Sequence, residues 1–276
     1  MKTRTLLALI WLILITSAAV AAPLIAVHDP IQPVSAPLQT PDRSLLLGTD
    51  SLGRDLYSRL VFGSRTTLSA ALLAAALSIS GGLILGLAAS FSGGWIERAM
   101  LLLFNAAMSI PGLLLAMLFV AGLGPGFPSV ILGAGLSAVP GFARLIHSET
   151  VSIRTRPFIR ASKALGAGRP WIYLYHVIPN LRPALLSYGT TYLAWAFTGI
   201  TTLNFLGLAG DPSIPEWGVM LNSGRTYLLE APYLVLIPGL MISFTILSFH
   251  TVGDWLSSVE MLRWRRNAVP GEKAQK

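Results

Sequence analysis

Long apolar stretches without a charged residue alternate with short polar segments along this chain. A helix needs about 20 mostly apolar residues to cross the hydrocarbon core of a membrane. Stretches of at least that length occupy residues 5–27, 66–96, 99–143, 183–210 and 231–253. The 99–143 stretch is long enough for two helices, and GLGPG at 122–126 predicts a turn within it, because glycine and proline disfavour helix continuation. We therefore predict six transmembrane helices.

The composition agrees with a polytopic membrane protein and excludes several other classes. Hydrophobic residues make up 53% of the 276 residues. Charged residues make up only 12%, whereas about 25% is usual in soluble proteins. The chain also contains no cysteine. These values exclude a disordered chain, a disulfide-stapled secreted domain and an ordinary soluble enzyme.

The positions of the charged residues predict the orientation in the membrane. The net charge is +8. When the N-terminus is placed inside, most of the 20 Lys and Arg residues fall in cytoplasmic segments, as basic residues do in membrane proteins. We therefore predict that both termini are cytoplasmic and that the positive charge reflects topology, with no nucleic acid bound. The small residues at 18–22 leave open an alternative in which the first helix is a cleaved signal peptide.

The longest cytoplasmic segment, residues 144–182, has the pattern of two short helices. Pro157 can begin the first helix and Gly166 can end it, because glycine adopts positive φ without strain. Pro170 can begin a second helix through Val177, which Pro179 would end. Small or apolar residues share one face of the first helix, namely Phe158, Ala161, Ser162 and Leu165. The pattern fits either a membrane-surface hairpin or a docking element for a cytoplasmic partner.

The segment before the second predicted span lies outside in this topology. Thr49, Asp50 or Ser51 can cap the helix that follows. Asp55 and Arg59 have the spacing of an i, i+4 ion pair. The sequence therefore predicts a capped helix entrance in this outer segment.

Four blocks of the sequence together resemble ABC importer permeases, with the closest pattern in the dipeptide/oligopeptide/nickel family. FIRASKALGA at 158–167, followed by HVIPN at 176–180, resembles the EAA loop of these proteins. LGTDSLGRDLYSRL at 47–60 resembles the segment after the first helix of the second, C-type permease. The remaining blocks are FLGL at 205–208 with EWGVML at 216–221, and the dipeptides Pro238-Gly239 and Gly253-Asp254. The blocks occur in the family order, but Arg160 replaces the glutamate of the EAA signature and Ser162 replaces its second alanine.

The resemblance implies an all-α membrane protein with the type I ABC importer transmembrane fold. It divides the chain into an N-terminal helix (1–27), a periplasmic segment (28–65), a permease core (66–254) with a coupling loop at 144–182, and a basic cytoplasmic tail (255–276). The implied ATPase-coupling residues are Phe158, Arg160, Ala161, Ser162, Ala164, Leu165 and Gly166. The residues implied to lie where substrate enters from the periplasm are Gly48, Thr49, Asp50, Gly53, Arg54 and Asp55. The pore-lining residues are not identified.

The resemblance also implies partners in a bacterial or archaeal cytoplasmic membrane. They are a homologous second permease, two cytoplasmic ATPase subunits and a periplasmic or lipid-anchored substrate-binding protein. No lysine of this chain follows a glycine, so a G-x-x-x-x-G-K-[ST] phosphate loop is absent from the sequence. We therefore expect no enzyme activity and no bound cofactor in this chain, with ATP and Mg²⁺ on the ATPase subunits.

Three hypotheses about function follow. The first is an ATP-driven importer of peptides. The same architecture could import nickel or a metal–chelator complex, although no His-rich or carboxylate cluster predicts a metal site. An ion-coupled secondary transporter is the alternative from another class. It would usually carry ionisable residues inside its spans, and the predicted spans contain no Asp, Glu, Lys or Arg.

Overall fold

The computed structural model describes residues 3–268, with side chains described as far as Val259. In this part of the chain the regular structure is helical, apart from two isolated β-bridges. Most of the predicted basic tail therefore lies outside the described side chains. The helices are α1 (Thr3–Ile25), α2 (Leu56–Ser92), α3 (Gly94–Met108), α4 (Gly112–Leu123), α5 (Phe127–Arg154), α6 (Pro157–Ala164), α7 (Arg169–Ile172), the π-helix η1 (Tyr173–Val177), α8 (Ile178–Asn180), α9 (Arg182–Phe205), α10 (Trp217–Gly224), the 3₁₀-helix η2 (Arg225–Tyr227) and α11 (Tyr233–Ala268).

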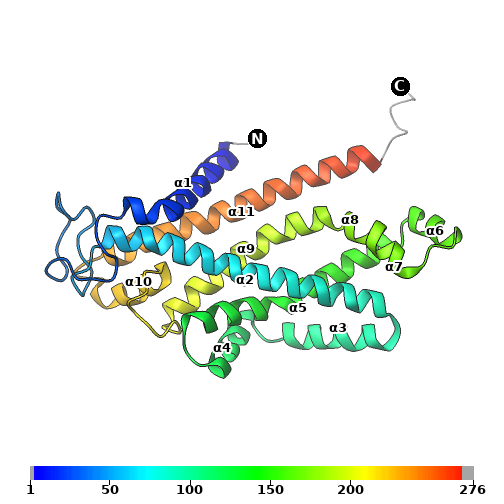
Figure 1. Ribbon diagram of the computed structural model, residues 1–276, viewed down its shortest axis with the longest axis horizontal. Coiled ribbons are helices and arrows are strands. Elements are labelled where there is room, and N and C mark those ends of the chain that lie inside the picture. Colours follow the sequence, from blue (N-terminus) through cyan, green and yellow to red (C-terminus); the bar gives the residue numbers. More distant parts are fainter. Residues whose placement is uncertain (1–2, 269–276) are drawn as a thin grey trace.

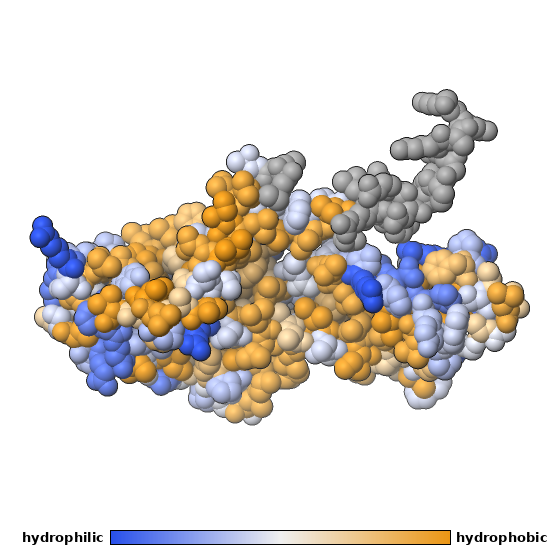
Figure 2. Space-filling model, turned by 45° about the horizontal axis from the view of Figure 1, so that its top comes forward, coloured by the Kyte–Doolittle hydropathy of each residue, from blue (hydrophilic) through white to orange (hydrophobic). Residues whose placement is uncertain are grey.

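The long helices run lengthwise through an elongated molecule that has two different ends (Figure 1). The segment between α1 and α2 lies at one end together with α10, and we call this the outer end. At the opposite end, the inner end, lie α6, α7 and α8. Hydrophobic residues cover most of the middle of the face in Figure 2, and hydrophilic residues gather towards the two ends. This distribution is that of a chain crossing a membrane, with the α6–α8 segment on the predicted cytoplasmic side.

Four of the described helices are long and apolar enough to cross a membrane, and a bent pair can supply a fifth span. The four are α1, α2, α5 and the Tyr233–Val259 part of α11, and the pair is α3 with α4. The sixth predicted span corresponds to α9, which is richer in Thr, Tyr and Ser than the others. Since α9 contacts α2, α5 and α11, much of its surface meets protein instead of lipid, and it can carry these polar side chains.

The third predicted span consists of two helices with a sharp bend between them. The prediction placed its end at 122–126, and α4 does end there, at Leu123. However, the helix is already interrupted before Pro111, and α3 and α4 are bent by 94° to each other. Proline cannot donate a backbone hydrogen bond and its ring obstructs the preceding turn, so α4 begins afresh at Gly112.

Charged residues also proved to be poor markers of helix ends. α2 begins at Leu56, not at residue 66: Arg59 is buried and paired and Arg65 is exposed, and neither interrupts the helix. α5 continues past Arg144 to Arg154, so the connection predicted to begin at Arg144 starts only at Thr155. A helix that extends beyond the apolar layer can carry charges on its last turns without interruption.

The second helix of the inner end is longer than predicted. It continues through α7, η1 and α8 to Asn180, so Pro179 does not end it. Pro179 instead lies in the first turn of α8, directly after the π-helical turn of η1. In an α-helix its ring would clash with the carbonyl of Tyr175, and the wider π-turn relieves that contact.

Small residues allow α2 and α5 to pack closely. A Cβ atom at Gly82 would lie 2.6 Å from Cβ of Phe142, and one at Gly86 would lie 2.5 Å from the carbonyl oxygen of Ala143. In membranes, such close approach of two helix backbones is a main source of helix association.

Gly82→Val is therefore expected to lower the free energy of unfolding by about 1–3 kcal/mol, because the added methyl groups overpack this interface. The measurement is the thermal unfolding midpoint of the purified protein in detergent. Gly122→Val is the matched control, because a Cβ at Gly122 meets no atom within 4 Å. Equal midpoints for the two variants would contradict the close packing of α2 on α5.

Candidate functional site

Two glycines shape the segment of the outer end that joins α1 to α2. Gly48 and Gly53 both have φ of +75°, a conformation that other residues adopt only with strain. A Cβ at Gly53 would lie 2.2 Å from the carbonyl oxygen of Ser35, and one at Gly48 would lie 2.3 Å from that of Gln39. The predicted GTDSLGRD motif therefore forms a tight, doubled-back loop in which neither glycine can be replaced without a clash.

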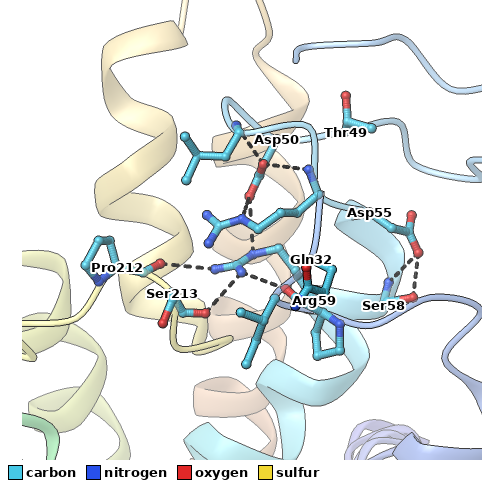
Figure 3. A network of polar contacts seen from close by, with 12 residues as sticks. Gln32, Thr49, Asp50, Asp55, Ser58, Arg59, Pro212 and Ser213 are labelled. Carbon is cyan, nitrogen blue, oxygen red and sulfur yellow. Dashed lines mark hydrogen bonds and ion pairs between the residues drawn. The ribbon is translucent and has the colours of Figure 1, made fainter. Parts of the chain in front are cut away.

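Asp50 is the centre of a buried charge network in this loop (Figure 3). Its Oδ1 accepts hydrogen bonds from the backbone N–H groups of Leu52 (2.8 Å) and Arg54 (3.0 Å). Its Oδ2 pairs with Nε of Arg54 at 2.7 Å and with Nε of Arg59 at 3.4 Å. One carboxylate thus pairs with two guanidinium groups, whose side chains are only 4% and 2% exposed.

Arg59 connects three separate segments of the outer end. From the first turns of α2, its Nη1 donates to the carbonyl oxygens of Pro30 (2.8 Å) and Ser213 (3.2 Å). Its Nη2 donates to the carbonyl oxygen of Pro212 at 3.4 Å. Because the same guanidinium also pairs with Asp50, it holds the α1–α2 segment against the loop that precedes α10.

Asp55 is the residue that caps α2. Its carboxylate accepts from the backbone N–H of Ser58 at 3.0 Å and from the Ser58 hydroxyl at 2.5 Å, and it lies 3.5 Å from Nδ1 of His28. The predicted Asp55–Arg59 ion pair is therefore wrong. At the N-cap position a short side chain turns towards the free N–H groups of the first turn, so Arg59 takes Asp50 as its partner.

The predicted caps Thr49, Asp50 and Ser51 are likewise wrong. The Thr49 hydroxyl accepts from the N–H of Gln39 and donates to the carbonyl of Ala36, so it closes the loop. In this arrangement the charged and hydroxyl side chains predicted to meet entering substrate are buried and contact one another or the loop backbone. What they can do here is fix the shape of the outer end, and a direct contact with substrate stays a prediction.

A fully buried carboxylate lies beside this loop, and sequence reasoning gave it no role. Glu216 caps α10 by accepting from the N–H of Val219 at 2.9 Å, and it accepts from the hydroxyl of Thr67 in α2 at 3.1 Å. The neighbouring Trp217 donates its indole N–H to the carbonyl of Leu60 at 2.9 Å. The only available signal was an acidic residue directly before an apolar helix, which is a general capping pattern.

Burial raises the pKa of Glu216 to about 7, although the hydrogen bonds that it accepts from Val219 and Thr67 lower it in part. Between pH 4.5 and about pH 7, the folded protein therefore keeps a proton on Glu216 that the unfolded chain, with its ordinary pKa of 4.5, has already released. Stability is highest below pH 4.5 for this group and falls as pH rises to about 7.

We expect Glu216→Gln to remove this pH dependence, which amounts to on the order of 3 kcal/mol between the two limits. Glutamine is permanently neutral and keeps an oxygen that can cap α10. The measurement is the unfolding midpoint of both proteins between pH 5 and pH 8. An identical decline in the two proteins would show that Glu216 is not the titrating group.

The inner end presents a helix–glycine–helix hairpin, as the sequence predicted. Gly166 has φ of +88° and follows α6. Its N–H donates to the carbonyl of Lys163, and the N–H of Ala167 donates to that of Ser162, both at 3.0 Å. This pair of bonds is the Schellman motif that ends helices at glycine. No atom lies within 4 Å of a Cβ at Gly166, so the need for glycine here comes from the backbone alone.

Most of the predicted coupling residues lie on the surface of this hairpin. Phe158, Arg160, Ala161, Ala164 and Leu165 are exposed, and Ser162 is half-buried. Leu165 is 89% exposed at the tip. The residue that sequence reasoning missed is Ile159, which is fully buried and packs in a cluster with Ile153 of α5 and Val177 of η1. Ile159 therefore anchors α6 to the transmembrane helices.

Similar proteins carry out transport across bacterial membranes. The chain is 35% identical to the dipeptide transport system permease protein DppC of Alkalihalophilus pseudofirmus, over 91% of this chain and 84% of that protein. It is 35% identical to the di/tripeptide transport system permease protein DppC of Pseudomonas aeruginosa, over 90% and 84% of the two chains. It is 32% identical to the glutathione transport system permease protein GsiD of Pectobacterium atrosepticum, over 78% and 72%.

The fold and the family agree with these similarities. The fold is similar to a chain of the MetNI methionine ABC transporter in an inward-facing conformation, with a TM-score of 0.60 and 20% sequence identity over 74% of this chain and 97% of that chain. This likeness establishes the type I ABC importer transmembrane fold. Residues 78–259, well over half of the chain, match the family described as binding-protein-dependent transport system inner membrane component. The chain therefore belongs to this family of multi-pass inner-membrane proteins, which work as transport permeases together with other subunits.

Proposed function

We propose that this chain is one permease subunit of an ATP-driven importer of di- and oligopeptides. The relatives described above are named for dipeptide, di/tripeptide and glutathione transport, which favours peptides over the nickel and metal–chelator alternatives. In this proposal a homologous second permease completes the pore and a periplasmic or lipid-anchored binding protein delivers the peptide. Two cytoplasmic ATPase subunits hold ATP and Mg²⁺.

The observation that carries the proposal is the exposed hairpin at the inner end. Apolar side chains that extend into water favour contact with another protein. Leu165 is 89% exposed at the tip, and Trp171, Leu174 and Tyr175 on the second arm are 47%, 60% and 64% exposed. We infer that this hairpin, with α6 as its coupling helix, is the contact for an ATPase subunit. The exposed basic residues Arg160 and Lys163 beside it would favour an acidic surface on that subunit.

The packing of the hairpin supports transmission of force. Ile159 of α6 lies in one apolar cluster with Ile146 and Ile153 of α5. The same cluster contains Val177 of η1 and Leu181, which directly precedes α9. Arg154 at the end of α5 also donates to the carbonyl of Ser90 in α2 at 2.8 Å. A displacement of α6 by ATPase closure would therefore move α2, α5 and α9 together, as packed elements move in rigid-body transitions.

The network of the outer end has a complementary role in this proposal. It fixes the loop before α2 and the loop before α10 relative to each other, so the binding protein would dock on a preformed surface. A preformed surface favours docking because less conformational freedom is lost on association. The residues predicted to lie where substrate enters would then act by holding this surface in shape.

The test is uptake by the complete complex reconstituted in liposomes, with the binding protein outside the vesicles and ATP inside them. Radiolabelled dipeptide is expected to accumulate only with ATP, and the same vesicles should not accumulate radioactive nickel. A proton or sodium gradient without ATP should drive no uptake. Accumulation of nickel, or of peptide driven by an ion gradient alone, would overturn the proposal.

A further inference from the structure

His176 lies between the two arms of the inner hairpin. Its Nε2 is 3.0 Å from the hydroxyl oxygen of Ser162 in α6. Its ring contacts Phe158 of α6 and Trp171 of α7 in edge-to-face geometry, with ring centroids 5.8 Å and 4.9 Å apart. His176 thus makes polar and aromatic contacts between the arms, in addition to the apolar contacts of Ile159.

The hydrogen bonds around Ser162 define the tautomer of this histidine. The Ser162 hydroxyl is also 3.0 Å from the carbonyl oxygen of Phe158, to which it donates its single hydrogen. For both bonds to form together, Nε2 of His176 must carry a proton and donate to the Ser162 oxygen. The carbonyl of His176 in turn accepts from the side-chain amide of Asn180 at 2.7 Å, which holds the π-helical turn.

This arrangement depends on a residue at which the chain departs from the EAA signature. Ser162 stands where the signature has its second alanine, and alanine has no hydroxyl to bond to His176. The hydrogen bond therefore adds a link between the arms that the signature residue could not make.

We propose that His176 is a positioning residue that locks α6 to the second arm through Ser162, so that the hairpin moves as one rigid unit. The inference rests on the proposed coupling function, since a rigid hairpin passes the full movement of the ATPase to α5 and α9. A hinge between the arms would absorb part of that movement, and ATP would be hydrolysed without import.

The functional experiment compares peptide imported per ATP hydrolysed in the reconstituted complete complex. His176→Phe keeps an aromatic ring but loses the donor, Ser162→Ala loses the acceptor, and His176→Gln keeps an N–H donor. Each of the first two is expected to lower the ratio by about three- to tenfold, the range that one lost hydrogen bond can produce. The double variant His176→Phe/Ser162→Ala should be no worse than the poorer single variant, and His176→Gln should retain more coupling than His176→Phe. His250→Phe, at an exposed histidine of α11, is the control.

A second measurement separates failure of this inference from failure of the proposed function. Amide hydrogen exchange at residues 165–167 should be faster in Ser162→Ala than in the unchanged protein, whatever the complex transports. Unchanged exchange, or additive effects of the two substitutions on the ratio, would overturn the role of His176. Faster exchange in a complex that imports no peptide would leave the interlocked hairpin intact and overturn the proposed function instead.

Discussion

Replacing Asp50 with asparagine is expected to destabilise the protein more than any other single change at the outer end. The substitution removes the negative charge that pairs with both Arg54 and Arg59, whose side chains are 4% and 2% exposed. Removal of one member of a buried ion pair usually costs about 3–5 kcal/mol, because the remaining charge stays buried without compensation. The loop would open to hydrate the guanidinium groups, and the amount of folded protein recovered in detergent should fall sharply.

Asp42→Asn provides the matched control, because Asp42 lies in the same loop but is exposed. Hydrogen bonds from Ser44 and Leu45 hold the pKa of Asp42 below its usual range, and asparagine can keep such contacts. The unfolding midpoint and the yield of monodisperse protein are the measurements. If Asp50→Asn unfolds at the same temperature as Asp42→Asn, the buried network does not hold the outer end together.

Replacing Gly166 with valine is expected to uncouple ATP hydrolysis from peptide import while leaving the transmembrane helices folded. A β-branched residue at φ of +88° is strained even though space is free around it. The strain, about 1–2 kcal/mol, is relieved when the Schellman turn opens and α6 changes its direction. Import by the reconstituted complex should fall at least tenfold, with ATP hydrolysis largely retained.

Gly94→Val controls for strain at a glycine turn in general. Gly94 has φ of +60°, is exposed, and also has no atom within 4 Å of a Cβ, but it is the first residue of α3, directly after the turn that follows α2. This variant should import peptide at close to the unchanged rate. Equal loss of import in both variants would contradict a specific role of the α6 hairpin.

Features that depend on the local chain alone could be predicted from the sequence. The apolar stretches at 5–27 and 231–253 correspond to α1 and to the first part of α11, because apolar length is what a membrane span requires. Gly166 was identified for the same kind of reason, since a left-handed residue after a helix favours glycine wherever it occurs.

Features that depend on distant partners could not be predicted. Arg59 appeared to mark the outside of a span, but Asp50 and the carbonyls of Pro212 and Ser213 surround its charge and let α2 begin before it. The pairing of Asp55 with Arg59 followed the helical spacing rule correctly and failed because Asp55 lies at the N-cap. Ile159 and His176 acquire their roles only when α6 folds back on the second arm.

Cross-linking from the tip of the inner hairpin tests most directly whether this hairpin contacts an ATPase subunit. Because the chain contains no cysteine, an introduced cysteine is the single thiol of this subunit. Leu165→Cys places one thiol at the tip of the inner hairpin, where the leucine is 89% exposed, and Leu229→Cys places one at the outer end, where it is 97% exposed. When a maleimide–benzophenone reagent attached to the introduced thiol is illuminated in the reconstituted complete complex, we predict a covalent product with the ATPase subunit from Leu165→Cys and none from Leu229→Cys. A product from Leu229→Cys, or none from Leu165→Cys in an ATP-hydrolysing complex, would contradict the assignment of this hairpin as the coupling site.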